Sequence, residues 1–421
     1  MEHLEKIPKG VAKEKSDRVK HDLLDKRWAI LSLSSIPLVM TLGNSMLIPV
    51  LPMMERELTI SSFQSSLIIT VYSVVAIFLI PIAGFLSDHI GRKKVIIPSL
   101  LIAGIGGIIS GWASWQMNDG YWLILIGRAL QGVGAAGAAP IVMPLVGDMF
   151  QSEDEVSSSL GMIETSNTLG KVLSPILGSF LAGFIWFLPF FAFPFFCAIS
   201  ILLMFFLVKT PNSNEDPMPF KLFFQKVKDI FKNNGRWLCA TFLIGAILMF
   251  VLFGVLFYLS DVLEKNYDIK NIKKGLLLAV PLGALCLSSY ITGKNIKENK
   301  VLMKWITFGG TLLLAASIAA LSFSKGLWFI IAMFFLSGVG IGAVLPCLDA
   351  LITEGIEKEQ RGTITSIYSS MRFVGVAAGP PAIAILMKNT EHSLFFLLSG
   401  LSILATLATF MAIKPEKEKA S

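Results

Sequence analysis

Apolar residues along this chain fall into runs of about twenty, separated by short polar segments. A run of that length crosses the hydrocarbon core of a bilayer as an α-helix. We therefore predict an all-α integral membrane protein with twelve transmembrane helices in two pseudo-symmetric six-helix bundles. The predicted helices lie near residues 28–54, 65–87, 95–113, 122–146, 156–184, 187–208, 237–260, 275–293, 301–323, 327–352, 363–387 and 394–413.

The polar segments between these runs predict the domain organisation. A cytoplasmic N-terminal tail (1–28) precedes the first bundle (29–208), a central cytoplasmic loop (209–236) joins it to the second bundle (237–413), and a cytoplasmic tail (414–421) follows. The tail lacks the short apolar region of a cleavable signal, so we predict a solvated or membrane-surface segment. Within the loop, residues 219–232 alternate Phe and Lys at helical spacing, which favours an amphipathic helix in the membrane interface over a partner-binding helix.

The two halves repeat at an offset of 206 residues. The matched positions are Gly132 and Gly338, Gly134 and Gly340, Pro140 and Pro346, and Pro175 and Pro381. One such pair means little in Gly-rich helices, but four at one offset indicate duplicated halves. In transporters built from parallel repeats the substrate site lies between the halves, near the middle of the membrane.

Composition and charge indicate a membrane protein rather than a protein that binds nucleic acid. Hydrophobic residues make up 54% of the chain and charged residues 15%, whereas soluble domains carry about 25% charged residues. The net charge of +7 comes mainly from segments predicted to be cytoplasmic, as the positive-inside rule requires when both termini are cytoplasmic. Segment 261–274 is an exception, because it places four lysines on the predicted outer side.

Residues for metal binding or catalysis are not grouped in this sequence. The four cysteines lie in or beside apolar spans without CxxC spacing, which predicts free buried thiols. The four histidines lie in tails or loops, so we expect no metal and no enzyme. Residues 132–137 fit GxGxxG, but they lie inside a predicted span, where small residues favour close helix packing over nucleotide binding.

A tight basic turn separates the second and third predicted spans. Its sequence, GFLSDHIGRKK, contains Gly84, Asp88, Gly91, Arg92 and Lys93. The spacing resembles the loop between the second and third spans of major facilitator transporters, Gly-x-Leu-Ala-Asp-x-x-Gly-Arg-[Arg/Lys].

The resemblance implies a cytoplasmic gate. Asp88 would meet the start of the eleventh helix near Thr363, where the helix dipole attracts an anion. Arg92 would meet Asp148 at the end of the fourth helix. An acidic segment after Asp148 suits the basic turn as an intramolecular partner.

Arg128 lies within the fourth predicted span. The segment GRALQGVG resembles the superfamily's fourth-span motif, Arg-x-x-x-Gly-x-Gly, which implies an interior arginine involved in proton transfer. A charge inside a span is costly unless it is paired or hydrated. The alternative is an arginine that reaches to the outer interface.

The fifth predicted span carries opposite charges on one face. Glu164 and Lys171 are two helical turns apart and share that face with Asn167. Because lipid-facing charges are prohibitive, these side chains are predicted to face a water-filled cavity. A carboxyl group there can change its protonation state as its neighbours move, which proton coupling requires. A structural ion pair is the alternative.

Two further segments resemble the fifth-span antiporter motif, Gly-x-x-x-Gly-Pro-x-x-Gly-Gly. In the first, Gly170, Pro175 and Gly178 match, while Ser174 and Ser179 replace two glycines. This resemblance implies a helix-packing segment typical of exporters, and the serines weaken that inference. An echo in the eleventh span, residues 375–381, begins about one turn after Arg372 and contains Gly379 and Pro380. Arg372 is a candidate cavity cation or an anchor for an anionic substrate.

Together, these motifs imply a proton-coupled exporter in the drug:proton antiporter group, located in the cell membrane. The expected substrate is an amphipathic small molecule, either drug-like or a secreted metabolite such as a siderophore. The implied partners are that substrate, protons and the lipid bilayer, with no cofactor and with a monomeric chain. The alternatives are an uptake symporter, a transporter of lipids or anionic metabolites, an integral membrane enzyme, and a transport-inactive sensor.

Overall fold

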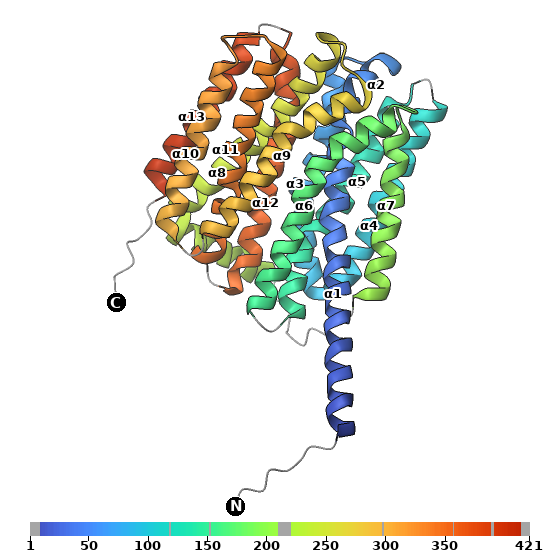
Figure 1. The fold of residues 1–421 in the computed structure, drawn as a ribbon, viewed down its shortest axis with the longest axis vertical. Coiled ribbons are helices and arrows are strands. Elements are labelled where there is room, and N and C mark those ends of the chain that lie inside the picture. Colours follow the sequence, from blue (N-terminus) through green and yellow to red (C-terminus); the bar gives the residue numbers. More distant parts are fainter. Residues whose placement is uncertain are drawn as a thin grey trace, which may run out of the picture.

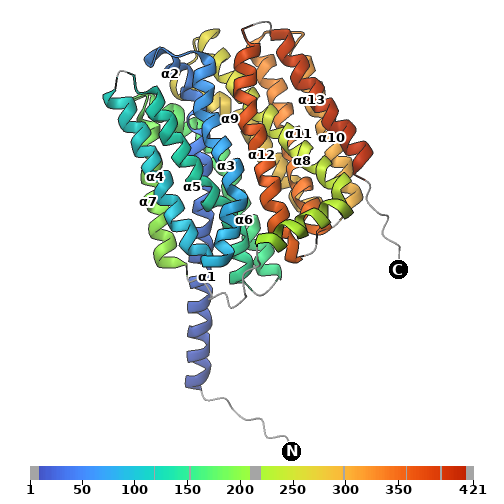
Figure 2. The same ribbon diagram turned by 180° about the vertical axis from the view of Figure 1, so that it is seen from behind.

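The computed structural model describes residues 9–117, 119–150, 153–208, 220–296, 299–356, 358–388 and 391–413. Every regular element in these ranges is helical, and the two halves of the chain form two bundles that stand side by side (Figure 1, Figure 2). The first half contains α1 (Lys9–Ser45), η1 (Ile48–Val50), α2 (Leu51–Glu57), α3 (Ser62–Ile90), α4 (Arg92–Gln116), α5 (Tyr121–Met149), α6 (Glu153–Ala182) and α7 (Leu188–Leu207). The second half contains α8 (Phe220–Lys265), α9 (Asn271–Ile296), α10 (Lys300–Ala320), α11 (Leu327–Gly355), α12 (Lys358–Leu386) and α13 (Glu391–Ala412).

Eleven segments of the described chain are long and apolar enough to cross a membrane. The one predicted span outside this set is the fifth (156–184), which corresponds to α6, a helix of 30 residues. Its polar side chains, Glu164, Asn167 and Lys171, lower its hydropathy. A helix that lines an internal cavity tolerates such residues because they do not face lipid.

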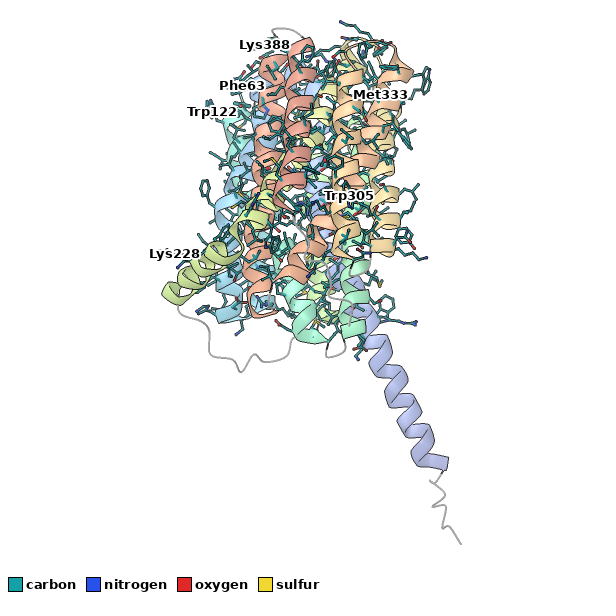
Figure 3. All side chains as sticks on the ribbon, turned by 90° about the vertical axis from the view of Figure 1, so that its left-hand side faces the viewer. Phe63, Trp122, Lys228, Trp305, Met333 and Lys388 are labelled. Carbon is teal, nitrogen blue, oxygen red and sulfur yellow. The ribbon has the colours of Figure 1, made fainter. Side chains whose placement is uncertain are left out.

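Two predicted boundaries differ from the structure. The N-terminal tail is helical from Lys9, because α1 extends beyond the predicted span and projects from the bundle (Figure 1). The predicted amphipathic helix is not separate: α8 runs without a break from Phe220 to Lys265. No proline interrupts that stretch, and proline is the strongest helix breaker. The start of α8 slants away from the bundle at Lys228 (Figure 3).

Large apolar side chains cover the outside of the bundle. Phe78, Phe206 and Trp328 are at least 70% exposed, a pattern that suits contact with lipid tails rather than water. All four cysteines are free, but only Cys197 and Cys347 are buried, so the prediction of buried thiols is wrong for Cys239, whose side chain is exposed.

Matched glycines confirm the pseudo-symmetry of the two bundles. A Cβ atom on Gly132 of α5 would lie 2.4 Å from the Tyr72 carbonyl oxygen of α3. A Cβ atom on Gly338 of α11 would lie 2.2 Å from the Pro281 carbonyl oxygen of α9. Since α3 and α9 are the second spans of their halves, glycine serves the same close helix contact in both.

The halves meet along two helix pairs. In the first, α3 packs against α12, and in the second, α6 packs against α9. The Thr70 hydroxyl donates a hydrogen bond to the Ala377 carbonyl across the first pair, at 2.7 Å. This arrangement places the charged face of α6 near the boundary between the halves.

Candidate functional site

Polar residues of α6 form the first-half side of an internal cluster. The Thr41 hydroxyl of α1 donates to Asn167 Oδ1 at 2.6 Å, and Asn167 Nδ2 donates to Glu164 Oε1 at 3.2 Å. Lys171 Nζ is buried, and the described residues give it no hydrogen-bond partner. The predicted shared face of Glu164, Asn167 and Lys171 is therefore present, and Asn167 orients the carboxylate.

The second half contributes an acid and a base to the same region. Asp349 of α11 lies 3.7 Å from Arg372 of α12, measured between Oδ1 and NH1. The Arg372 guanidinium stands 5.6 Å from the centre of the Tyr368 ring, close enough for a cation–π attraction. Lys171 interacts electrostatically with Glu164, Asp349 and Arg372, so charges from both halves lie within range of one another.

We name Glu164, Lys171, Asp349 and Arg372 the central cluster. It contains two acids and two bases, so its formal charges cancel when all four ionise. Glu164 and Asp349 are both only partly buried.

Sequence reasoning missed Asp349 and Tyr368. The signal for Asp349 was available, because an acid inside a membrane span is itself a candidate functional position. Asp349 lies within the predicted tenth span. Tyr368 lies one helical turn before Arg372 on α12, so the spacing was readable, but an uncharged tyrosine in a span does not by itself indicate a functional position.

Arg128 is interior but does not belong to the central cluster. Its side chain is fully buried. The guanidinium donates to the Ile68 carbonyl at 2.8 Å, the Gly43 carbonyl at 3.1 Å and Asn44 Oδ1 at 2.8 Å. It also donates to Gln131 and lies 4.7 Å from the Tyr72 ring centre. These partners are neutral and join α1, α3 and α5.

The antiporter-motif glycines provide close helix contacts. A Cβ atom on Gly178 would lie 2.0 Å from the Met46 carbonyl oxygen, and one on Gly170 would lie 3.1 Å from the Leu38 carbonyl oxygen. In the second half, a Cβ atom on Gly379 would lie 2.6 Å from the Phe250 carbonyl oxygen. Pro175 and Pro380 both lie inside their helices. The motif therefore sets α6 against the first span and α12 against α8.

We expect Gly178→Ala to destabilise the protein by about 1–3 kcal/mol, the usual cost of overpacking a tight contact. The added methyl group would overlap a backbone carbonyl, which cannot move aside as a side chain can. The measurement is the apparent melting temperature in detergent. Gly161→Ala is the matched control in the same helix, because a Cβ atom there meets no described atom within 4 Å. Equal melting temperatures for the two variants would contradict this packing role.

The structure contains one of the two contacts that were predicted for the gate motif, the ion pair between Arg92 and Asp148. Arg92 forms ion pairs with Asp88 and with Asp148, the latter at 3.1 Å between Nε and Oδ2. Arg92 NH1 also donates to the Ser87 hydroxyl at 2.8 Å. Asp148 is thus the partner that the resemblance implied, and the three helices α3, α4 and α5 are tied together at this end.

The remaining gate residues have different environments. Gly91 has φ +101°, a conformation that favours glycine and permits the sharp turn between α3 and α4. Lys93 Nζ donates to the Val208 carbonyl at 2.6 Å. A Cβ atom on Gly84 would lie 3.5 Å from the Ser366 hydroxyl of α12. α12 begins at Lys358, five residues before the expected start near Thr363, and the contact of Asp88 with the start of this helix stays a prediction.

Comparisons with known proteins agree with this architecture. The family model of the Major Facilitator Superfamily matches residues 33–300 and 300–421. The "Bacillibactin exporter" of Bacillus subtilis is 57% identical over 394 residues, which cover 93% of this chain and 98% of the relative. The "Multidrug resistance protein MdtG" of Escherichia fergusonii is 26% identical and covers 86% of this chain and 88% of the relative.

Solved structures show the same fold. The human organic anion transporter MFSD10 (TETRAN) aligns with a TM-score of 0.71 at 19% identity, covering 91% of this chain and 99% of that chain. A bacterial homologue of the human lysosomal transporter Spinster, inward-facing and occupied, aligns with a TM-score of 0.72 at 15% identity, covering 92% and 96%. This chain belongs to the Major Facilitator Superfamily. It is a multi-pass membrane transporter of the export type, and not an enzyme.

Proposed function

We propose that this transporter exports bacillibactin, or a close chemical relative of it, in exchange for protons. The observation that carries this proposal is the 57% identity to the Bacillus subtilis "Bacillibactin exporter" over 93% of this chain. The likeness extends through both halves, so it includes the helices that supply the central cluster.

In our proposal, the central cluster binds substrate and protons alternately. An ionised Glu164 or Asp349 can accept hydrogen bonds from substrate hydroxyl or amide groups, whereas a protonated carboxyl group has lost much of that capacity. Binding of substrate and of a proton then exclude each other, as antiport requires. Lys171 and Arg372 attract negative groups of the substrate, and Arg372 is oriented by Asp349 and Tyr368.

The proposed orientation places both termini in the cytoplasm and α2 at the outer face. The Asp88–Arg92–Asp148 contacts then lie at the cytoplasmic end, where they hold α3, α4 and α5 as one unit while the halves rock. One chain supplies both sides of the central cluster, so a monomer is sufficient for transport. The proton gradient supplies the energy.

The test is transport in liposomes that contain the purified protein and an internal pH-sensitive dye. With an acidic lumen, addition of bacillibactin outside should raise the luminal pH as protons leave in exchange. An amphipathic drug cation serves as the comparison substrate. Bacillibactin entry without a pH change would contradict proton coupling, and exchange driven only by the drug cation would contradict the assigned substrate.

A further inference from the structure

Six charged residues from both halves form an interlocked cluster at the end of the bundle opposite the N-terminus, where α2 lies (Figure 1). We call it the outer latch. Its members are Glu55 and Arg56 of α2, Asp261, Glu264 and Lys265 of α8, and Lys274 of α9. The latch contains three acids and three bases, so its formal charge is zero.

Two ion pairs of the latch join the halves directly. Arg56 of the first half pairs with Glu264 of the second. Lys265 Nζ of the second half lies 3.0 Å from Glu55 Oε2 of the first. The hydroxyl groups of Ser62 and Ser65 donate to Glu55 at 2.9 and 2.8 Å, which fixes the carboxylate on its side of the boundary.

Lys274 reinforces the junction from inside. It is 1% exposed, and its Nζ atom donates to Glu264 Oε2 and to the Pro49 carbonyl oxygen of η1, both at 2.7 Å. Nearby, the Ser260 hydroxyl donates to the Ile48 carbonyl at 2.9 Å. The cation therefore connects a buried acid of one half to the backbone of the other.

An apolar contact between the halves lies directly below the latch. Leu278 and Leu282 follow Lys274 at intervals of one helical turn on α9. A small cavity at this level is lined by Ser45, Ile48 and Pro175 of the first half and by Leu256, Leu278 and Leu282 of the second. The latch thus lies over the contact between the halves that would have to separate for substrate to leave at the end of the bundle where α2 lies.

We propose that the outer latch holds this end of the transporter closed and separates in each transport cycle. Separation takes the charges of the latch away from their partners but returns them to water. Because the gain in hydration offsets much of the lost attraction, such a cluster closes firmly and still opens reversibly. The inference rests on contacts between the halves and is independent of the substrate and of proton coupling.

The test measures the access of a water-soluble reagent to a cysteine beneath the latch. Ser45→Cys is placed in a variant whose four natural cysteines are alanine, and labelling by a membrane-impermeant maleimide is followed from the outer side. We expect Glu55→Gln and Arg56→Met each to raise the labelling rate about five- to tenfold, as a shift of about 1 kcal/mol or slightly more in the opening equilibrium would do. Combining Glu55→Gln with Lys265→Met should add little, because both remove the same contact between the halves, and the other ion pair of Lys265, with Asp261, lies within the second half.

Asp268→Asn is the matched control. Asp268 pairs with Lys270 in the loop between α8 and α9, so this ion pair lies at the same end but within one half. Labelling of Glu55→Gln and Arg56→Met no faster than that of Asp268→Asn would overturn the proposal.

A second reporter separates opening from unfolding. Cys197, which is 1% exposed within the first half, is retained as the only cysteine in place of Ser45→Cys. It should stay unlabelled in every latch variant. Fast labelling at both reporters would also overturn the proposal, because the latch would then maintain the fold rather than control access.

Discussion

Glu164→Gln should reduce proton-driven transport in liposomes to the level of protein-free vesicles. Glutamine retains an oxygen that accepts the Asn167 Nδ2 hydrogen bond, which is 3.2 Å long in the native protein, so the local geometry should be preserved. It cannot ionise, so the carboxyl group can no longer exchange a proton for substrate. The measurement is the initial rate of luminal pH change after substrate is added to vesicles with an acidic lumen.

The control for this variant is Asp119→Asn. Asp119 is an exposed carboxylate in the loop between α4 and α5, so its replacement makes the same change in charge outside the central cluster. Its transport rate should equal that of the native protein. Full proton-driven transport by Glu164→Gln would remove Glu164 from the mechanism, whereas retained substrate exchange without a pH change would show that coupling alone was lost.

Asp349 is the second carboxyl group that could exchange a proton. The Asp349→Asn variant shows whether one or two carboxyl groups carry the exchanged proton. If Glu164 alone exchanges the proton, Asp349→Asn should weaken substrate binding through the displaced Arg372 but leave the transport coupled. Partial coupling in each single variant, with complete loss only in the double variant, would contradict the complete loss expected for Glu164→Gln and would show that the two carboxyl groups share the proton.

The helices of this protein were easier to predict from the sequence than the contacts between them. Helices were predictable because the length of each apolar run matches the bilayer, and one face of α6 was predictable because Glu164, Asn167 and Lys171 lie at helical spacing. The partners of that face were not predictable in the same way. Asp349 and Arg372 come within range of Lys171 only after the two halves pack together, and a single sequence does not specify that packing.

The outer loop illustrates the same limit. Four lysines in segment 261–274 depart from the positive-inside rule, which treats each charge as if it were free in a loop. In the structure, Lys265 and Lys274 are neutralised by Glu55, Asp261 and Glu264. The departure of this segment from the positive-inside rule therefore coincided with ion pairs to distant parts of the chain. A lysine that is neutralised by an acid has little influence on the orientation of the protein in the membrane.

Arg128→Lys should destabilise the protein, although the charge is kept. The native guanidinium reaches three acceptors on two helices: the Ile68 carbonyl of α3, and the Gly43 carbonyl and Asn44 Oδ1 of α1. A lysine ammonium is a compact point charge on a flexible stem and cannot reproduce that planar fork. Each buried acceptor that loses its donor costs about 1–3 kcal/mol. The measurement is the apparent melting temperature in detergent, followed by proton-driven transport at a temperature where the variant is folded.

Arg236→Lys makes the same substitution at an exposed position, where Arg236 NH2 donates to the Met411 carbonyl at 3.0 Å, and it should leave the melting temperature unchanged. Arg128→Lys melting at the same temperature as Arg236→Lys would contradict the structural role. Transport separates the two interpretations of Arg128 further. Its partners are neutral, so a structural role predicts that the folded variant still couples substrate to protons. The proton-transfer role implied by the fourth-span resemblance predicts instead a stable protein that moves substrate without protons.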